Sequence, residues 1–526
     1  MSRQDPKDYS FILKFGGGVH SRAPENEIDL RECASGYNFL LDLQDSDFRN
    51  REPFDLVTTA PNGSEIRGMI SLLLSDGTVH AAVQAGSTIY EWDGATTFTS
   101  IGSCSATAQL RGRLEHNSQV DGVVIITDLN LQNALLSWDG TTLSTISFTG
   151  PAGTFKSKYC FVENERAWYA NIEDNGTAYP HLIVGSTRGD YTTVSVSDRP
   201  SSALSAADPF YMVQPDNMAI NGMVEAFGNV VLSSAKGSLY NVTGYDAQTF
   251  TINPFFPRSG ASGSESITFV GNDIIYGRQG RIESVTSTNT YADVENDDLS
   301  VDISDSIESF DNWTLAYNSR VQRVYCIPSG ESQAWVLFKS LEGGQVSPWS
   351  KYTTDHSMSF QPTCMMTMLD PSDGLEYVFM GDSSGNFYRM EGSGTSGDGG
   401  LNNIVSERVS KLIECPLDVE AYDIQGWIQY RKNEAATITL TFEFSGVNIF
   451  NESITISVPS ITDRTVYGGG FYYSDGNYYG STFSGRLTRQ KIGVPGESNQ
   501  FQIKVHIEGT TNFQVHSIGL TFRGAS

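Results

Sequence analysis

A short hairpin pattern recurs along the chain and limits the folds available to it. Residues 84–101 (QAGSTIYEWDGATTFTSI) and 133–147 (NALLSWDGTTLSTIS) each join two β-type runs through a Trp-Asp-Gly turn. The two tryptophans, Trp92 and Trp138, are 46 residues apart (138 − 92). This spacing matches the ~40–50 residues of a four-stranded propeller blade.

Weaker copies of the same pattern follow. Each places Asp-Gly, Gly-Asn or Ser-Gly between two apolar alternations, as hairpins require. They lie at 159–196, 224–246, 266–285, 323–352 and 376–392. A blade buries its faces only against neighbouring blades, so the series predicts a closed β-propeller of six to eight blades. A run of β-sandwich domains is the structural alternative, because hairpin spacing alone does not show that a ring closes.

The whole chain is predicted to be all-β, because helical periodicity is almost absent. The Gly-rich stretch 393–403 predicts a linker or loop, and the strands after it are longer and lack Trp-Asp-Gly turns. We therefore divide the 526 residues into an N-terminal docking segment (1–60), a propeller (61–392), the linker (393–403) and a β-sandwich-like domain (404–526). The segment 1–60 is expected to pack with the C-terminal domain, through pairing of residues 8–55 with 401–526.

Charge and cysteine content narrow the function classes. A formal net charge of −27 argues against tight binding to nucleic acid phosphates, although an acidic lumen would let duplex DNA pass without adhering. The six cysteines are far apart, with no paired spacing typical of zinc sites, so we interpret them as reduced and buried. The N-terminus lacks a signal-peptide pattern, and synthesis and assembly in a cytoplasm are expected.

No catalytic constellation is visible in the sequence. The seven histidines are scattered, and Gly16-Gly17-Gly18 lacks both phosphate-loop and dinucleotide motifs, so we interpret this run as a flexible bend. We predict no catalytic residues, no cofactor and no metal ligands, and therefore no enzyme. A polysaccharide-cleaving propeller is the enzymatic alternative, but the repeated Ser-x-Asp-x-Gly-x-Thr-Trp turn of sialidase-type blades is missing.

The densest run of acidic residues is 293–311 (DVENDDLSVDISDSIESFD). One interpretation is a negative channel lining, formed by Asp293, Glu295, Asp297, Asp298, Asp302 and Asp305. The alternative is a short amphipathic helix, since Val294, Leu299, Ile303 and Ile307 recur at helical steps. The run lacks the residue order of a calcium-binding EF-hand loop, although its carboxylates could hold Ca²⁺.

The N-terminal segment carries a composite pattern: a glycine bend, a Pro-x-x-Glu-hydrophobic element, an asparagine within a strand and a closing arginine-proline element. Its residues are Gly17, Gly18, Pro24, Glu27, Ile28, Asn38, Arg49, Arg51 and Pro53. This resembles the opening of tail nozzle, or tail hub and packaged-DNA stabilisation, proteins of short-tailed bacteriophages. Residues 334–352 and 500–523 are similar to a blade and to the closing hairpin of the same family.

The resemblance implies a structural virion protein, one subunit of a ring of about six copies in a phage tail. Such a ring extends the portal and adaptor channel, retains packaged DNA, lets it pass on ejection, and bears fibres or spikes. Expected partners are further copies, portal and adaptor proteins, tail fibres or spikes, and duplex DNA in the lumen, with no membrane insertion by this chain. A receptor-binding tail protein and a peptide-binding cellular propeller are the alternatives.

Two groups of residues are candidates for contacts between subunits or for docking. The first belongs to the N-terminal pattern and consists of Arg49, Arg51 and Phe54. The second lies in the Gly- and Tyr-rich segment 468–483, interpreted as an exposed loop, and consists of Tyr472, Tyr473, Tyr478 and Tyr479. A loop that packs on its own domain is an equally good interpretation of this segment.

Overall fold

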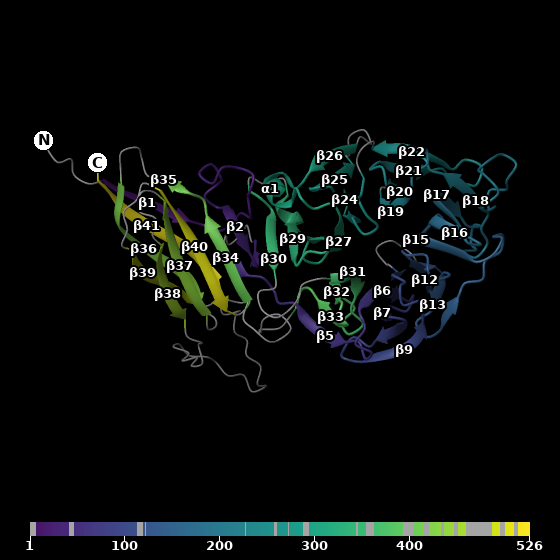
Figure 1. The fold of residues 1–526 in the computed structure, drawn as a ribbon, viewed down its shortest axis with the longest axis horizontal. Helices are drawn as coiled ribbons and strands as arrows, with labels where there is room; N and C mark the ends of the chain where they lie inside the picture. The colour runs from purple at the N-terminus through teal and green to yellow at the C-terminus, as the bar shows by residue number, and fades with distance from the viewer. Residues whose placement is uncertain are drawn as a thin grey trace, which may run out of the picture. The chain divides into compact units, whose positions relative to one another are not determined.

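The computed structural model divides the chain into two compact units. The first contains Met1–Pro53, Trp335–Met358 and Gly392–Ser526, and the second contains Phe54–Ala334 and Ser359–Glu391. The structure describes residues 7–41, 47–112, 119–120, 122–226, 228–256, 260–271, 273–287, 294–342, 346–353, 362–392, 404–414, 420–432, 436–445, 451–458, 486–494, 500–509 and 514–525. The regular secondary structure of its described part is almost all β-strand, as predicted (Figure 1).

The described strands of the second unit, together with residues 335–353 of the first, form consecutive antiparallel blades, which we number one to seven. Blade one contains β6 (Ile66–Leu73), β7 (Val79–Ala85), β8 (Thr88–Trp92) and β9 (Phe98–Ser103), and blade two contains β10 (Leu110–Gly112), β12 (Val123–Asp128), β13 (Leu136–Trp138) and β14 (Leu143–Thr145), with β11 (Gln119–Val120) beside β12. Blade three contains β15 (Phe155–Glu163), β16 (Arg166–Asp174), β17 (Thr177–Gly185) and β18 (Phe210–Val213). Blade four contains β19 (Ile220–Ala226), β20 (Asn229–Ser234), β21 (Leu239–Thr243) and β22 (Thr251–Phe256).

The remaining blades follow the same order. Blade five contains β23 (Ile267–Val270), β24 (Asp273–Arg278), β25 (Arg281–Ser287) and β26 (Val294–Asp298). Blade six contains β27 (Trp313–Asn318), β28 (Arg323–Pro328), β29 (Gln333–Phe338) and β30 (Trp349–Thr353), and the division between the two units falls within β29. Blade seven contains β31 (Pro362–Leu369), β32 (Glu376–Asp382) and β33 (Asn386–Arg389), with β5 (Asp55–Thr59) as its outer strand.

The blades close into a ring. Contacts between strands of successive blades run in order from blade one to blade seven, and β31 then contacts β6 of blade one. The first strands of blades one and two also pair directly, with Arg111 opposite Met69 in parallel register. The fold is therefore a β-propeller, and the sandwich-domain alternative for this part of the chain is wrong.

An early strand completes the last blade. β5 pairs antiparallel with β33, so residues from before blade one supply the outer strand of blade seven. Arg389 on β33 supports this pairing, because its guanidinium contacts Asp55 Oδ2 at 3.3 Å and Asp370 Oδ2 at 3.4 Å. The same group lies 4.7 Å from the ring centre of Tyr377.

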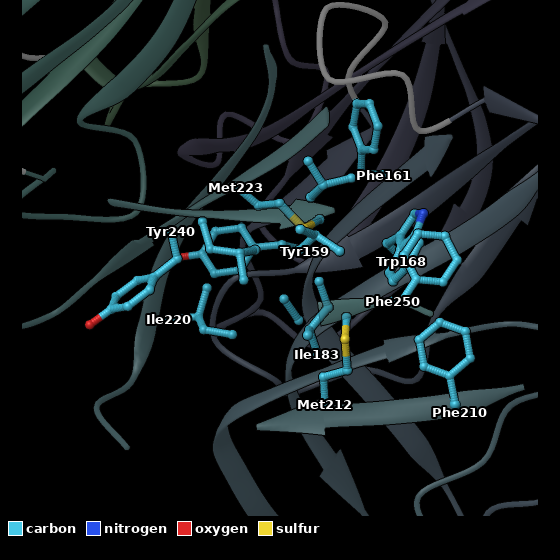
Figure 2. Packing of buried hydrophobic residues seen from close by; sticks show 14 of the residues in the cluster. Tyr159, Phe161, Trp168, Ile183, Phe210, Met212, Ile220, Met223, Tyr240 and Phe250 are labelled. Carbon is cyan, nitrogen blue, oxygen red and sulfur yellow. The ribbon is translucent and has the colours of Figure 1, made fainter. Parts of the chain in front are cut away.

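Aromatic side chains fill the spaces between neighbouring blades. Figure 2 shows the cluster between blades three and four, where Trp168 meets Phe250 edge-on at 4.9 Å and Phe210 at 5.7 Å between ring centres. Trp92 lies similarly against Phe379 and Phe387 of blade seven, each at 5.2 Å. Such packing is the main favourable term that holds one blade to the next.

The two Trp-Asp-Gly turns close the outer hairpins of blades one and two. Asp93 Oδ1 accepts hydrogen bonds from the backbone N–H groups of Ala95 and Thr97, and Asp139 Oδ1 accepts them from Thr141 and Thr142. These bonds lower the pKa of both carboxyl groups. The glycines, Gly94 and Gly140, have φ of 80° and 90°, which other residues rarely adopt. The repeat therefore encodes the turn as well as its spacing.

The first unit contains two six-stranded sheets. Sheet A has the order β3 (Phe39–Leu40), β4 (Phe48–Asn50), β41 (Gln514–Ala525), β36 (Glu420–Lys432), β39 (Arg486–Val494), with β1 (Lys7–Leu13) also paired to β41. Sheet B has the order β2 (Cys33–Tyr37), β34 (Ile404–Ser410), β40 (Gln500–Gly509), β37 (Ala436–Ser445), β38 (Asn451–Val458), with β35 (Ile413–Glu414) beside β40. Strands from both ends of the chain thus contribute to each sheet.

Alternation along the strands defines the core of this sandwich-like unit. On β40, Phe501, Ile503, Val505 and Ile507 are fully buried, while the residues between them are partly or fully exposed. Phe501 meets Phe11 of sheet A at 6.3 Å between ring centres. One face of each sheet is therefore apolar and directed inward.

Two local predictions require correction. The expected helix over 294–307 is wrong in its first half, because Val294–Asp298 is the outer strand β26; only η1 (Val301–Ile303) and α1 (Ser304–Ile307) are helical. The Gly16-Gly17-Gly18 run is not a free bend, since all three residues are buried and Gly18 N–H donates to the carbonyl of Ser347 at 2.8 Å.

Gly18 provides a stability test. A Cβ at this position would lie 2.0 Å from the carbonyl oxygen of Trp349, which is backbone and cannot rotate away. We expect Gly18→Ala to lower the free energy of unfolding by about 1–3 kcal/mol, the usual cost of overpacking. Urea unfolding followed by circular dichroism measures the change. Gly263→Ala is the control, because its Cβ would meet no atom closer than the Oγ of Ser266 at 3.2 Å. Equal stability of the two variants would contradict the conclusion that the backbone around Gly18 leaves no room for a side chain.

Candidate functional site

An ion pair lies across the axis of the propeller. Arg111, on the first strand of blade two, donates from Nε to Glu265 Oε1 at 2.6 Å and from Nη2 to Oε2 at 2.9 Å. Glu265 lies two residues before the first strand of blade five, and blades two and five are three places apart in a ring of seven. No two blades in such a ring are farther apart, so the pair reaches across the centre.

Further bonds tie this pair to other blades. Arg111 Nη1 donates to the carbonyl of Arg67 in blade one at 2.7 Å, and the carbonyl of Glu265 accepts from Leu315 N–H in blade six at 2.8 Å. The Arg111 side chain is 5% exposed and that of Glu265 is 14% exposed. Burial by itself would lower the pKa of Arg111, but the Glu265 carboxylate outweighs it and the pKa is raised. Four blades are thereby joined at one end of the axis.

The chemistry of the axial pair is structural. A bidentate arginine–carboxylate pair is strong, but it leaves neither group free to act on a substrate. Sequence reasoning missed both residues, because they are 154 positions apart and neither stands in a motif. Their juxtaposition follows from ring closure.

The N-terminal pattern forms a buried polar joint in the first unit, which we call the N-terminal joint and define by Asn38, Arg51 and Thr353. Arg51 Nε donates to Asn38 Oδ1 at 2.9 Å, and its Nη2 donates to the carbonyl of Thr353 at 3.0 Å. Thr353 N–H donates to the same Asn38 oxygen at 2.8 Å. Asn38 Nδ2 in turn donates to the carbonyl of Val405 at 3.0 Å.

The joint explains why these residue types stand at these positions. Asn38 has φ of 60°, a left-handed conformation that asparagine tolerates better than most residues, and its amide can donate and accept at once. The guanidinium of Arg51 supplies several fixed donors, which the facing carbonyls need when they are buried. Three segments that are distant in sequence, around residues 38–51, 353 and 405, therefore meet at two side chains.

The predicted acidic channel residues fall on the outer part of blade five. Asp297 and Asp298 belong to β26, the last strand of the blade, and Asp297 is exposed while Asp298 is half-buried. Asp302 lies in η1 and the exposed Asp305 in α1. Glu295 is on β26, and Asp293 lies outside the described residues. The structure groups the described members along one segment and not around the propeller axis.

The predicted contact residues have different surroundings. Arg51 and Phe54 are both 0% exposed, so they are not available on the surface as contacts for another subunit, and this part of the prediction is corrected. Arg49 lies on β4 and is half-buried. Tyr472, Tyr473, Tyr478 and Tyr479 lie outside the described residues, as does the Gly-rich stretch 393–403.

The described cysteines are free thiols, and four of them, Cys33, Cys160, Cys326 and Cys364, are buried. Burial raises the pKa of Cys33 to about 11 and that of Cys364 to about 12, so both remain protonated. Within the described ranges, no three His, Cys, Asp or Glu side chains are grouped to hold a metal ion. No helix there is long and apolar enough to cross a membrane.

Comparisons with known proteins give distant likenesses. No family model and no curated protein matches the chain. Among solved structures, the WD40 domain of coronin from Toxoplasma gondii is 8% identical, covers 74% of this chain and 86% of its own, with a TM-score of 0.34. YCF48 bound to D1 peptide is 16% identical and covers 65% and 97%, with a TM-score of 0.37. The computationally designed Ika8 protein is 13% identical and covers 64% and 99%, with a TM-score of 0.34.

The axial pair makes a specific energetic prediction. Glu265→Ala leaves the Arg111 guanidinium buried without its carboxylate, so we expect the free energy of unfolding to fall by about 3–5 kcal/mol. Denaturant unfolding of the full chain measures this loss. The control is Glu65→Ala, which breaks the nearby Arg67–Glu65 pair, whose side chains are each 30% exposed. That loss should stay below about 1 kcal/mol, and similar losses in both variants would show that the axial pair has no special role.

Proposed function

We propose that the protein is a structural subunit of a bacteriophage tail ring, a nozzle or hub built from about six copies. In this role the ring extends the portal and adaptor channel, retains packaged DNA and lets it pass on ejection. Its partners are further copies of itself, portal and adaptor proteins, and tail fibres or spikes. The protein contributes walls and interfaces and does not catalyse a reaction.

The observation that carries this proposal is the N-terminal joint. Two residues of the pattern that resembles tail nozzle and hub proteins, Asn38 and Arg51, are buried at the junction of three chain segments. Two more, Gly17 and Gly18, are buried close to Val346 and Trp349. Each makes a backbone contact that other residue types would make less well. The glycines allow a close approach of the backbone, Asn38 adopts a left-handed conformation, and Arg51 supplies several hydrogen-bond donors. These four residues, on which the resemblance partly rests, therefore each have a structural role in this chain.

The axial ion pair also supports a role as a wall. Its side chains occupy the centre of the propeller at one end, so we expect DNA to pass through the lumen of the assembled ring and not along the propeller axis. In that arrangement the exposed carboxylates of blade five, Asp297 and Asp305, are available to face the lumen. The net charge of −27 would keep the duplex from adhering to such a wall.

Electron microscopy of the purified full chain tests the proposal. We expect closed rings of uniform copy number, and decoration of tailed virions or tail assemblies when the protein is mixed with portal and adaptor proteins. Incubation with host surface polysaccharides should release no oligosaccharide. Particles without ring symmetry at all concentrations, or cleavage of polysaccharide, would reject the structural role in favour of a receptor-binding or depolymerising tail protein.

A further inference from the structure

The strands of sheet A have a charge opposite to that of the chain. They carry eight basic residues, Lys7, Arg49, Arg431, Lys432, Arg486, Arg489, Lys491 and Arg523, and three acidic ones, Asp8, Glu420 and Asp423. Their net charge is therefore 8 − 3 = +5, which leaves −27 − 5 = −32 on the remaining residues. The strands of sheet B carry two basic and five acidic residues, a net charge of −3. Positive charge is thus concentrated on one sheet.

Strand register identifies the outward face of sheet A. Ile428 is opposite Ile518, and both are fully buried, so this side of β36 and β41 faces the core. The adjacent position, Trp427, is opposite Gly519 and therefore belongs to the other face. Gly519 is in turn opposite Ile12 of β1, whose side chain is 51% exposed. The outward face consequently has an apolar row at its centre.

Trp427 lies flat on this face. A Cβ at Gly519 would come within 2.3–2.5 Å of the Trp427 indole, so the glycine leaves room for the ring to cover β41. The indole remains half-exposed. In register beside it on the edge strand β39 are the backbone positions of Lys491, opposite Trp427, and Arg489, opposite Gln429. A half-exposed tryptophan and an exposed isoleucine, with basic residues at the neighbouring strand positions, have the composition of a protein–protein contact.

We propose that the outward face of sheet A, centred on Ile12 and Trp427, is a self-association surface that docks on an acidic surface of a second copy of this chain. The argument is charge complementarity, since the strands of sheet A together carry a net charge of +5 while the rest of each copy carries −32. This inference rests on the proposed ring of copies and names one surface that holds it together.

A second copy fits the face better than nucleic acid does. Phosphate binding depends on clustered basic side chains and gains little from an exposed isoleucine beside a flat indole. In protein interfaces, an apolar centre excludes water, and the charged residues around it attract and orient the partner. Duplex DNA is therefore an outcome to be tested and not the proposed occupant.

Two substitutions in the full chain test the surface. Ile12→Glu places a charge at the apolar centre, and Arg489→Glu reverses a charge on the edge strand. We expect each to weaken self-association by about tenfold or more in sedimentation velocity. Association of the unaltered chain should also weaken between about 0.05 M and about 0.5 M salt, because the border is electrostatic.

Matched controls are available elsewhere on the chain. Leu375→Glu introduces the same charge at a side chain that is 45% exposed, and Lys236→Glu reverses an exposed charge on blade four. Both controls should associate like the unaltered chain. Circular dichroism and the thermal midpoint establish that all four variants are folded, so that a loss of association is not a loss of structure.

The other outcomes overturn the inference. Unchanged association of the folded Ile12→Glu and Arg489→Glu variants rejects the surface, as does a chain that stays monomeric at every salt concentration. The face is reassigned to nucleic acid if the unaltered chain retains duplex DNA and only the sheet A variants lose it while their self-association is intact. Rings that persist in both variants under the electron microscope reject this surface while leaving the proposed tail role in place.

Discussion

A four-stranded blade buries both of its faces only when another blade lies on each side of it, and the architecture of the second unit depends on that constraint. The series must therefore close, and it closes through contact of β31 with β6 and through β5, which completes blade seven. Closure brings blades two and five to opposite sides of the axis, where Arg111 and Glu265 form their buried pair. An interaction between residues 154 positions apart is thus a consequence of ring geometry.

The first unit solves a different problem, which is to hold distant segments in one sandwich. Strands from residues 7–50 pair with strands from residues 404–525 in both sheets. Buried backbone groups at such junctions need partners, and Asn38 and Arg51 supply them with several hydrogen bonds each. A polar joint of this kind is specific as well as stabilising, because an apolar substitute would leave the facing carbonyl groups unpaired.

Much of the fold was predictable. Each of the seven hairpin patterns identified in the sequence lies in one of the seven blades, because turn chemistry and strand alternation are local properties. The strand β39 was missed, since its basic residues obscure any apolar alternation in RLTRQKIGV. The helix expected from Val294 was wrong over residues 294–298, because these residues form an edge strand when β25 offers hydrogen-bonding partners. Arg51 and Phe54 were candidates for contacts between subunits or for docking, and tertiary packing buries both within their own chain.

The sequence by itself determined the all-β class, the hairpin turns, the change of strand type near residue 400, and the excess of negative charge. Only the tertiary structure decided that the ring closes with an early strand, that Asn38 and Arg51 form a joint, and that the strands richest in positive charge belong to sheet A. The physical reason is distance along the chain. Local turns depend on neighbouring residues, whereas these features depend on residues that meet only after the chain has folded.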